Sequence, residues 1–150
     1  MDAVVYPETS VVNFIQHKMI PLRIQFDTQP YCIDFNIKWT PTLITLDTGG
    51  TEHHRTTGFL GAEELIPSLL LGIAKSHFDL EQFNEALATL ETILKDHPKS
   101  DSAPEALYLR GVSQYKSTND PTPLKAAYEQ LKTEYPSSEW TKRAYPYSLL

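Results

Sequence analysis

The chain has 150 residues, enough for one ordinary domain or two small modules. Hydrophobic residues make up 41 % of it, and 13 Lys and Arg against 19 Asp and Glu give a formal net charge of −6. An acidic chain without a basic cluster is a poor candidate for nucleic acid, because neutralising phosphates supplies most non-specific affinity. We therefore expect no nucleic-acid partner.

Two kinds of segment are missing from the sequence. No apolar run approaches the ~20 residues needed to span a bilayer, and the N-terminus lacks the basic and apolar regions of a signal peptide. As given, the chain is expected to be cytoplasmic and to have no membrane partner, although a longer N-terminus could carry an export signal. One cysteine, Cys32, leaves no internal disulfide.

The first third of the chain predicts two short helices separated by a strand. Polar residues before Val11 precede an amphipathic pattern that predicts a helix ending near Lys18. Pro21–Phe26 alternates between apolar and polar residues, which predicts a strand. Asp27–Pro30 then caps a short helix over Tyr31–Phe35.

A second pattern begins at Lys38–Leu46, where a proline opens a run of branched apolar residues. Proline donates no hydrogen bond, so Pro41 suits the first position of a strand. Asp47–Gly50 is a strong turn signal. A more polar strand over 51–57 follows, and a helix begins at Ala62.

This order resembles the C-terminal half of a thioredoxin fold over residues 1–76. The resemblance implies a cis peptide bond at Thr40–Pro41. It also implies a peptide-binding lip formed by Thr40, Pro41 and Thr42, because the backbone beside that proline pairs with extended substrates in the family. The alternative is that these residues only shape the edge of the sheet.

The chain departs from the thioredoxin pattern in its cysteines. A thioredoxin-type enzyme needs two cysteines separated by two residues at a helix N-terminus, whereas Cys32 is alone and lies downstream of that position. We therefore expect a redox-inactive remnant without the first strand. The alternative is a fragment of a thiol-disulfide oxidoreductase whose Cys-x-x-Cys segment lies upstream of Met1.

From Glu63 the chain is predicted to be helical, with prolines between the helices. The spacing is similar to that of two tetratricopeptide repeats. The first copy is carried by Leu70, Ile73, Ala74, His77, Ala86, Leu90 and Pro98. The second, with one inserted residue, is carried by Leu107, Arg110, Gly111, Gln114, Leu124, Tyr128 and Pro136.

The repeat region is expected to occupy residues 67–150 and to share its first helix with the thioredoxin-like part. The resemblance implies a ligand groove near Lys75, Tyr108, Arg110 and Gln114. About three repeats are normally needed for stability. Either the segment around Trp140 caps the open end, or a second copy of the chain does.

Two further groups could in principle react or bind a metal. Cys32 could be a reactive thiol, but a lone apolar-face cysteine is more often a small buried hydrophobe. His53 and His54 are adjacent on a strand and point to opposite faces, so they cannot chelate one metal together. We expect no metal site and no cofactor.

These observations predict an α+β protein in which a partial thioredoxin-like unit continues into tetratricopeptide-like helical hairpins. The predicted function is non-catalytic binding of a protein or peptide partner, not enzymatic activity. Because an incomplete sheet exposes an edge that invites pairing, we also expect a homodimer that covers this edge.

Overall fold

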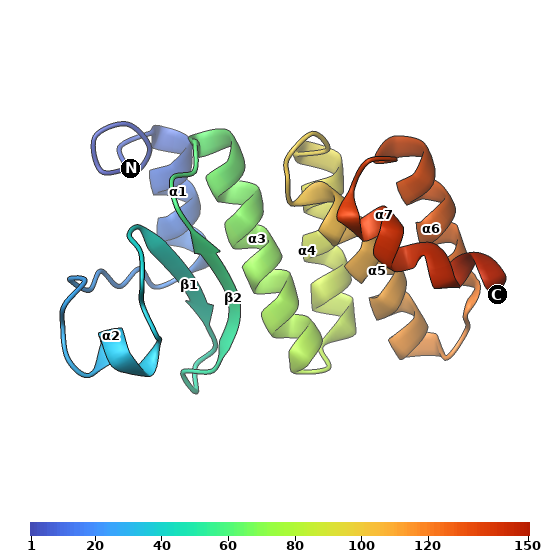
Figure 1. Ribbon diagram of the computed structural model, residues 1–150, viewed down its shortest axis with the longest axis horizontal. Helices are drawn as coiled ribbons and strands as arrows, with labels where there is room; N and C mark the ends of the chain where they lie inside the picture. Colours follow the sequence, from blue (N-terminus) through green and yellow to red (C-terminus); the bar gives the residue numbers. More distant parts are fainter.

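The computed structural model describes residues 1–150 and is mainly helical, with one small sheet (Figure 1). The first part of the chain carries the helices and strands α1 (Thr9–Lys18), α2 (Tyr31–Asp34), β1 (Thr42–Leu46) and β2 (Glu52–Thr57). The remainder carries α3 (Ala62–Asp79), α4 (Phe83–Asp96), α5 (Ala103–Thr118), α6 (Thr122–Glu134), α7 (Glu139–Ala144) and the 3-10 helix η1 (Tyr145–Leu149). The sheet lies at one end of the molecule, and α6 and α7 lie at the other (Figure 1).

The sheet is an antiparallel hairpin of β1 and β2, which confirms the two strands predicted around the turn. Its turn is held by Asp47, whose carboxylate accepts the backbone N–H groups of Gly49 at 2.8 Å and Thr51 at 2.9 Å. Gly50 has a φ of 84°, a backbone conformation that glycine adopts without steric cost. Asp47 and Gly50 thus supply the turn chemistry that the sequence indicated.

The strand predicted over Pro21–Phe26 is not formed. Between Ile20 and Phe26 the only backbone group with a backbone partner is the Gln25 carbonyl, which accepts from Thr28. The alternating apolar side chains of this segment are 40–95 % exposed. Alternation produces a strand only where a neighbouring strand supplies hydrogen bonds, and the sheet offers none to this segment. A thioredoxin-like unit over 1–76 is therefore not established by this two-stranded sheet.

Two X-Pro bonds are cis, Gln29–Pro30 and Thr40–Pro41. The second is the bond that the thioredoxin resemblance implied, and the first was not expected.

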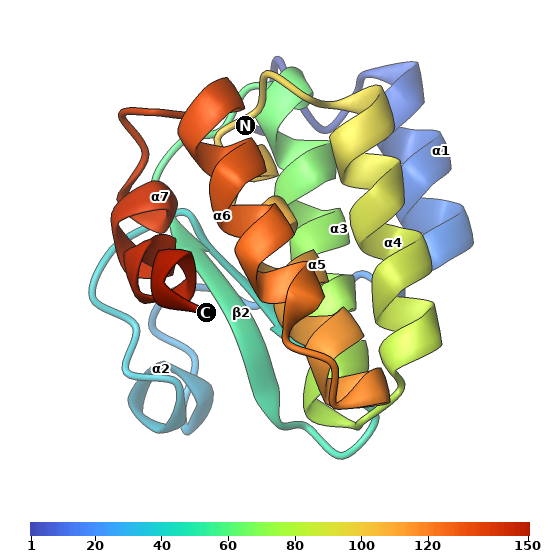
Figure 2. The same ribbon diagram turned by 90° about the vertical axis from the view of Figure 1, so that its right-hand side faces the viewer.

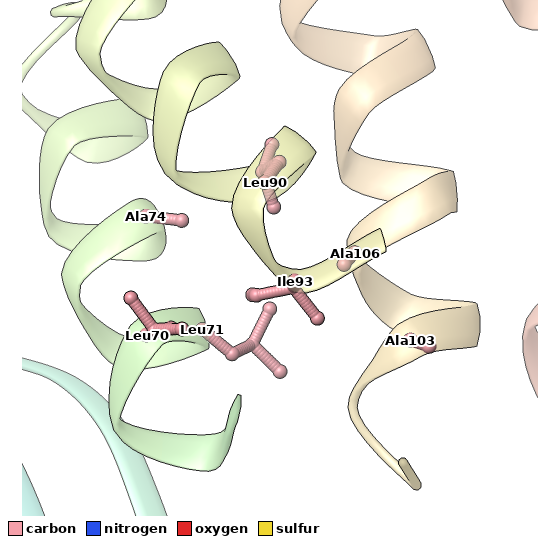
Figure 3. Close-up of a cluster of buried hydrophobic side chains, with 7 residues drawn as sticks. All are labelled: Leu70, Leu71, Ala74, Leu90, Ile93, Ala103 and Ala106. Carbon is pink, nitrogen blue, oxygen red and sulfur yellow. The ribbon is translucent and has the colours of Figure 1, made fainter. Parts of the chain in front are cut away.

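The helices α3 to α6 form two antiparallel hairpins that stack side by side, which is the tetratricopeptide-like arrangement that the spacing predicted. Their shared core is drawn in Figure 3, where side chains from α3, α4 and α5 meet. It consists of Leu70, Leu71, Ala74, Leu90, Ile93, Ala103 and Ala106. Every one of these side chains comes from a position with helical spacing, so periodicity alone places them on the inner faces.

The second hairpin has its own core, which α7 covers. Leu107, Tyr128, Leu131 and Ala144 are buried together there. Ser138 is the N-cap of α7, and its hydroxyl accepts the N–H of Trp140 at 3.1 Å. The segment that the sequence indicated as a cap therefore does pack on the last hairpin.

Helix α3 contributes to two buried clusters. Its Leu65 is buried with Val5 and Val11 from the N-terminal segment, while Leu70 and Leu71 enter the core of the helical stack. Gly72 lies against the sheet, where a Cβ atom would come within 2.9 Å of the Thr45 Cβ. The same helix therefore packs against both the sheet and the helical stack.

Candidate interaction surfaces

A polar network connects the sheet to the helical stack across α3. The Lys75 ammonium lies 2.5 Å from the Glu105 carboxylate of α5 and 3.3 Å from Nδ1 of His54 on β2. Nε2 of His54 lies 3.3 Å from the hydroxyls of both Ser68 and Thr56. Lys75 and Glu105 are 25 % and 18 % exposed, so this ion pair is partly shielded from solvent.

The protonation of His54 follows from these contacts. Burial, and then the positive charge of Lys75, lower the pKa of His54 to about 4, so the ring is neutral near pH 7. An ammonium group can only donate, so Nδ1 accepts from Lys75 and the ring proton is on Nε2. A protonated Nε2 cannot take a proton from Ser68. The serine–histidine contact is therefore a structural link, not the activated pair of a hydrolase.

Tyr108 lies one turn after Glu105, on the same face of α5. Its ring is 5.1 Å from that of Trp140 and stacks 5.8 Å from that of Tyr147, and the two tyrosine hydroxyls are 2.9 Å apart. Burial, and then the hydrogen bond with Tyr108, raise the pKa of Tyr147. We name the surface formed by Lys75, Glu105 and Tyr108 the α5 face. Figure 2 shows β2 and α7 on one side of the stack, with α1 on the other.

The four residues predicted to line a groove do not all lie on the same side of α5. Lys75 forms an ion pair with Glu105, and Tyr108 lies one turn after Glu105 on the same face of α5. Arg110 instead reaches Glu91 of α4 at 3.2 Å and Gln130 of α6 at 2.6 Å. Gln114 lies one turn after Arg110 and so shares its side of α5.

The predicted lip lies at the start of β1. The Thr42 hydroxyl donates to the Trp39 carbonyl at 2.7 Å, which holds the corner before the strand. Thr40 and Trp39 line a hollow of about 190 Å³ together with Phe26 and Lys38. Pro41 is half-buried between Thr40 and Thr42.

Cys32 is half-buried, whereas its interpretation as a small buried hydrophobe predicted a buried side chain. Helix α2 has only four residues and none of them is buried, because no other element covers it. The thiol lines a hollow of about 350 Å³, whose wall also includes Phe26, Ile33 and Lys38.

The two adjacent histidines lie at an irregularity in the pairing of β2 with β1, and they contact different groups. His53 is 4 % exposed and lies between two carboxylates, with Nδ1 2.6 Å from Asp79 and Nε2 3.2 Å from Asp47. The hydrogen bond with Asp79 is the main cause that raises the pKa of His53. Asp79 is 26 residues away in sequence, so no local pattern could have indicated this contact.

Exposed apolar side chains gather at the end of the molecule that carries the sheet. Of the large hydrophobic residues with exposed side chains, most lie before residue 61. They are Val4, Ile20, Leu22, Ile24, Phe26, Tyr31, Ile33, Trp39, Leu46 and Phe59. Exposed apolar side chains concentrated in one region of a protein are typical of an interaction surface.

Comparison with known proteins places the helical part in one family. Residues 62–146, more than half of the chain, match the family model described as "YfiO: Outer membrane lipoprotein". No curated protein and no solved structure matches the chain. None of its helices combines the length and the apolar character that crossing a membrane requires.

The family match corrects the predicted location. A family of outer membrane lipoproteins points to the cell envelope, which overturns the expectation of a cytoplasmic chain without membrane association. The matched residues are those of the stacked hairpins and α7, and they contain no signal from which location could be read. The chain belongs to the YfiO outer membrane lipoprotein family.

Proposed function

We propose that this protein is a non-catalytic module for protein–protein interaction in the cell envelope. The observation that carries the proposal is the pair of stacked helical hairpins, which coincides with the region matched to the outer membrane lipoprotein family. Stacked hairpins bury their apolar faces against one another and leave an extended surface for a partner. A rigid surface of this kind suits recognition of another protein.

The α5 face is the part of that surface that best fits a protein partner. It combines the Lys75–Glu105 ion pair with the aromatic group of Tyr108, Trp140 and Tyr147. Aromatic residues beside charged groups are typical of binding hot spots. Arg110 and Gln114 lie on the other side of α5 and are proposed as a secondary contact only.

We also propose that the N-terminal part is a thioredoxin-like remnant with Thr40, Pro41 and Thr42 as a lip for an extended peptide. The order of β1, the turn at Asp47 and Gly50, β2 and α3 supports this proposal. One thiol cannot form the dithiol that the oxidoreductase reading requires. The remnant is therefore proposed as a binding element.

Site-specific photo-cross-linking in cell-envelope extracts tests the proposed surface. A benzophenone amino acid replaces Tyr108 on the α5 face, and a matched variant carries it at Glu85, an exposed residue of α4. We expect a discrete cross-linked protein from position 108 and none from position 85. Equal products from both positions, or none from either, would count against the α5 face as the binding surface.

A further inference from the structure

The sheet has two free edges, and only one of them is protected. Strand β2 carries Glu52 and Arg55, which form an ion pair at 2.6 Å. Strand β1 has the sequence Thr-Leu-Ile-Thr-Leu, with no charge and no proline between Thr42 and Leu46. Charged side chains are a common means of preventing strand addition at an edge. The edge of β1 lacks this protection.

The direction of the backbone groups identifies which residues face the free edge. The Gly58 N–H donates to the Pro41 carbonyl at 2.8 Å, so Pro41 and the alternate residues after it bond to β2. Thr42, Ile44 and Leu46 therefore direct their N–H and C=O groups away from β2. The N–H and C=O groups of these three residues have no backbone hydrogen-bond partner.

This edge is complementary to itself. In a two-fold antiparallel pairing centred on Ile44, each Ile44 faces the same residue of the second copy, and Thr42 faces Leu46. No like charges meet in this register, because the strand has no charges. A two-fold contact requires a surface that fits its own copy, and an uncharged strand of alternating Thr and aliphatic residues provides one.

Exposed apolar side chains around β1 would add buried area to such a contact. Trp39 and Phe59 flank the end of the hairpin where Thr42 faces Thr57, and they are 67 % and 62 % exposed. Leu46 is exposed at the other end. With the apolar segment from Ile20 to Phe26, these side chains offer on the order of several hundred Å². The paired strands themselves must supply the rest of the ~800 Å² that a stable interface takes from each partner.

We propose that β1 pairs edge to edge with β1 of a second copy, giving a four-stranded antiparallel sheet in the register centred on Ile44. This goes beyond the proposed partner-binding role of the helices, because it uses the free edge of β1 and none of the α5-face residues. It also names the edge and the register of the dimer that the sequence predicted.

Disulfide trapping tests the register directly. Hydrogen-bonded antiparallel pairs have Cα atoms ~5.5 Å apart, within the ~4.4–6.8 Å range of disulfides. The variant Ile44→Cys, in a Cys32→Ser background, is therefore expected to form a covalent dimer on mild oxidation. The matched control Thr57→Cys on β2 should remain monomeric under the same conditions. Equal cross-linking of both variants would overturn the register.

Light scattering at increasing concentration tests the dimer without any cysteine. The unaltered chain should approach twice its 17.0 kDa mass, and Ile44→Lys should raise the dissociation constant more than tenfold by placing like charges opposite each other. Thr42→Pro should act similarly by removing an edge donor, while Thr57→Lys should leave dimerisation unchanged. Circular dichroism confirms that each variant folds. A monomer at every concentration would overturn the proposal and leave the edge to a strand of another protein or to a lipid surface.

Discussion

His53 and His54 are neighbours in the chain, but opposite charges surround them. His53 lies between the carboxylates of Asp47 and Asp79, and only a protonated ring can donate to both. His54 lies beside the Lys75 ammonium in a mostly buried position. The folded state therefore prefers one of these rings charged and the other neutral.

Stability should accordingly depend on pH in opposite directions through these residues. The pKa of His53 is raised on folding, so its contribution is present below ~6.5 and is lost as pH rises through the raised value. The pKa of His54 is lowered to about 4, so its contribution is lost as pH falls from ~6.5 towards 4 and amounts to at most about 3 kcal/mol. Denaturant unfolding across pH 4–9 should show both slopes.

Single variants separate the two slopes. His53→Gln should flatten the alkaline slope, and His54→Gln should flatten the acidic one. Unchanged profiles in both variants would show that these histidines do not set the pH dependence.

Gly111 marks the closest approach of α5 and α6. A Cβ atom at this position would lie 2.6 Å from the Ala127 Cβ and 3.0 Å from the Pro123 carbonyl oxygen. Gly111→Ala gains ~1 kcal/mol of helix propensity, but overpacking typically costs ~1–3 kcal/mol, and backbone atoms cannot move aside easily. We expect net destabilisation of about 1 kcal/mol by thermal or denaturant unfolding.

A double variant identifies the cause of that loss. Ala127→Gly removes one of the two clashing atoms. The double variant, Gly111→Ala with Ala127→Gly, should therefore be more stable than the sum of the two single-variant effects predicts. Simple additivity would indicate that helix packing at this contact is not limiting.

At the scale of elements, α4 is held between α3 and α5 by a few fully buried side chains. Ile93 has no exposed surface and belongs to the core drawn in Figure 3. Ile93→Ala should therefore reduce the free energy of unfolding by about 2–5 kcal/mol. Leu80→Ala, at a side chain 50 % exposed, should change it by less than about 0.5 kcal/mol. Similar losses in both variants would contradict this assignment of the core.

The helices and the hairpin turn were predictable because their causes are local. Periodic apolar residues, Pro98 and Pro136 define the stack, and Asp47 with Gly50 defines the turn. The segment Pro21–Phe26 was mispredicted because its alternation indicates a strand, while strand formation depends on a partner elsewhere. In the helical part the local pattern agrees with the tertiary contacts, whereas in the segment Pro21–Phe26 it does not.

The candidate site was harder to predict than the fold. Lys75 was proposed as a groove residue, but its ion-pair partner Glu105 was not. The resemblance to tetratricopeptide repeats grouped Lys75 with Arg110, which bonds to α4 and α6. Side-chain pairing across helices depends on long-range packing, which the order of residues within one helix does not encode.

At the scale of the whole molecule, the two proposed surfaces use different residues. The sheet edge carries the exposed apolar residues, and the α5 face lies between β2 and the C-terminal helices. A substitution at one surface therefore leaves the residues of the other unchanged. Dimerisation and partner binding can therefore be measured independently on the same chain.

The continuity of α3 has a mechanical consequence. Its 18 residues carry Leu65 into one cluster and Leu71 into another, so rotating one end against the other would require breaking helical hydrogen bonds. The molecule therefore has no hinge between the sheet and the helical stack. Two copies joined at their strands would hold their far ends at a constant span, as a rigid spacer between whatever is attached there.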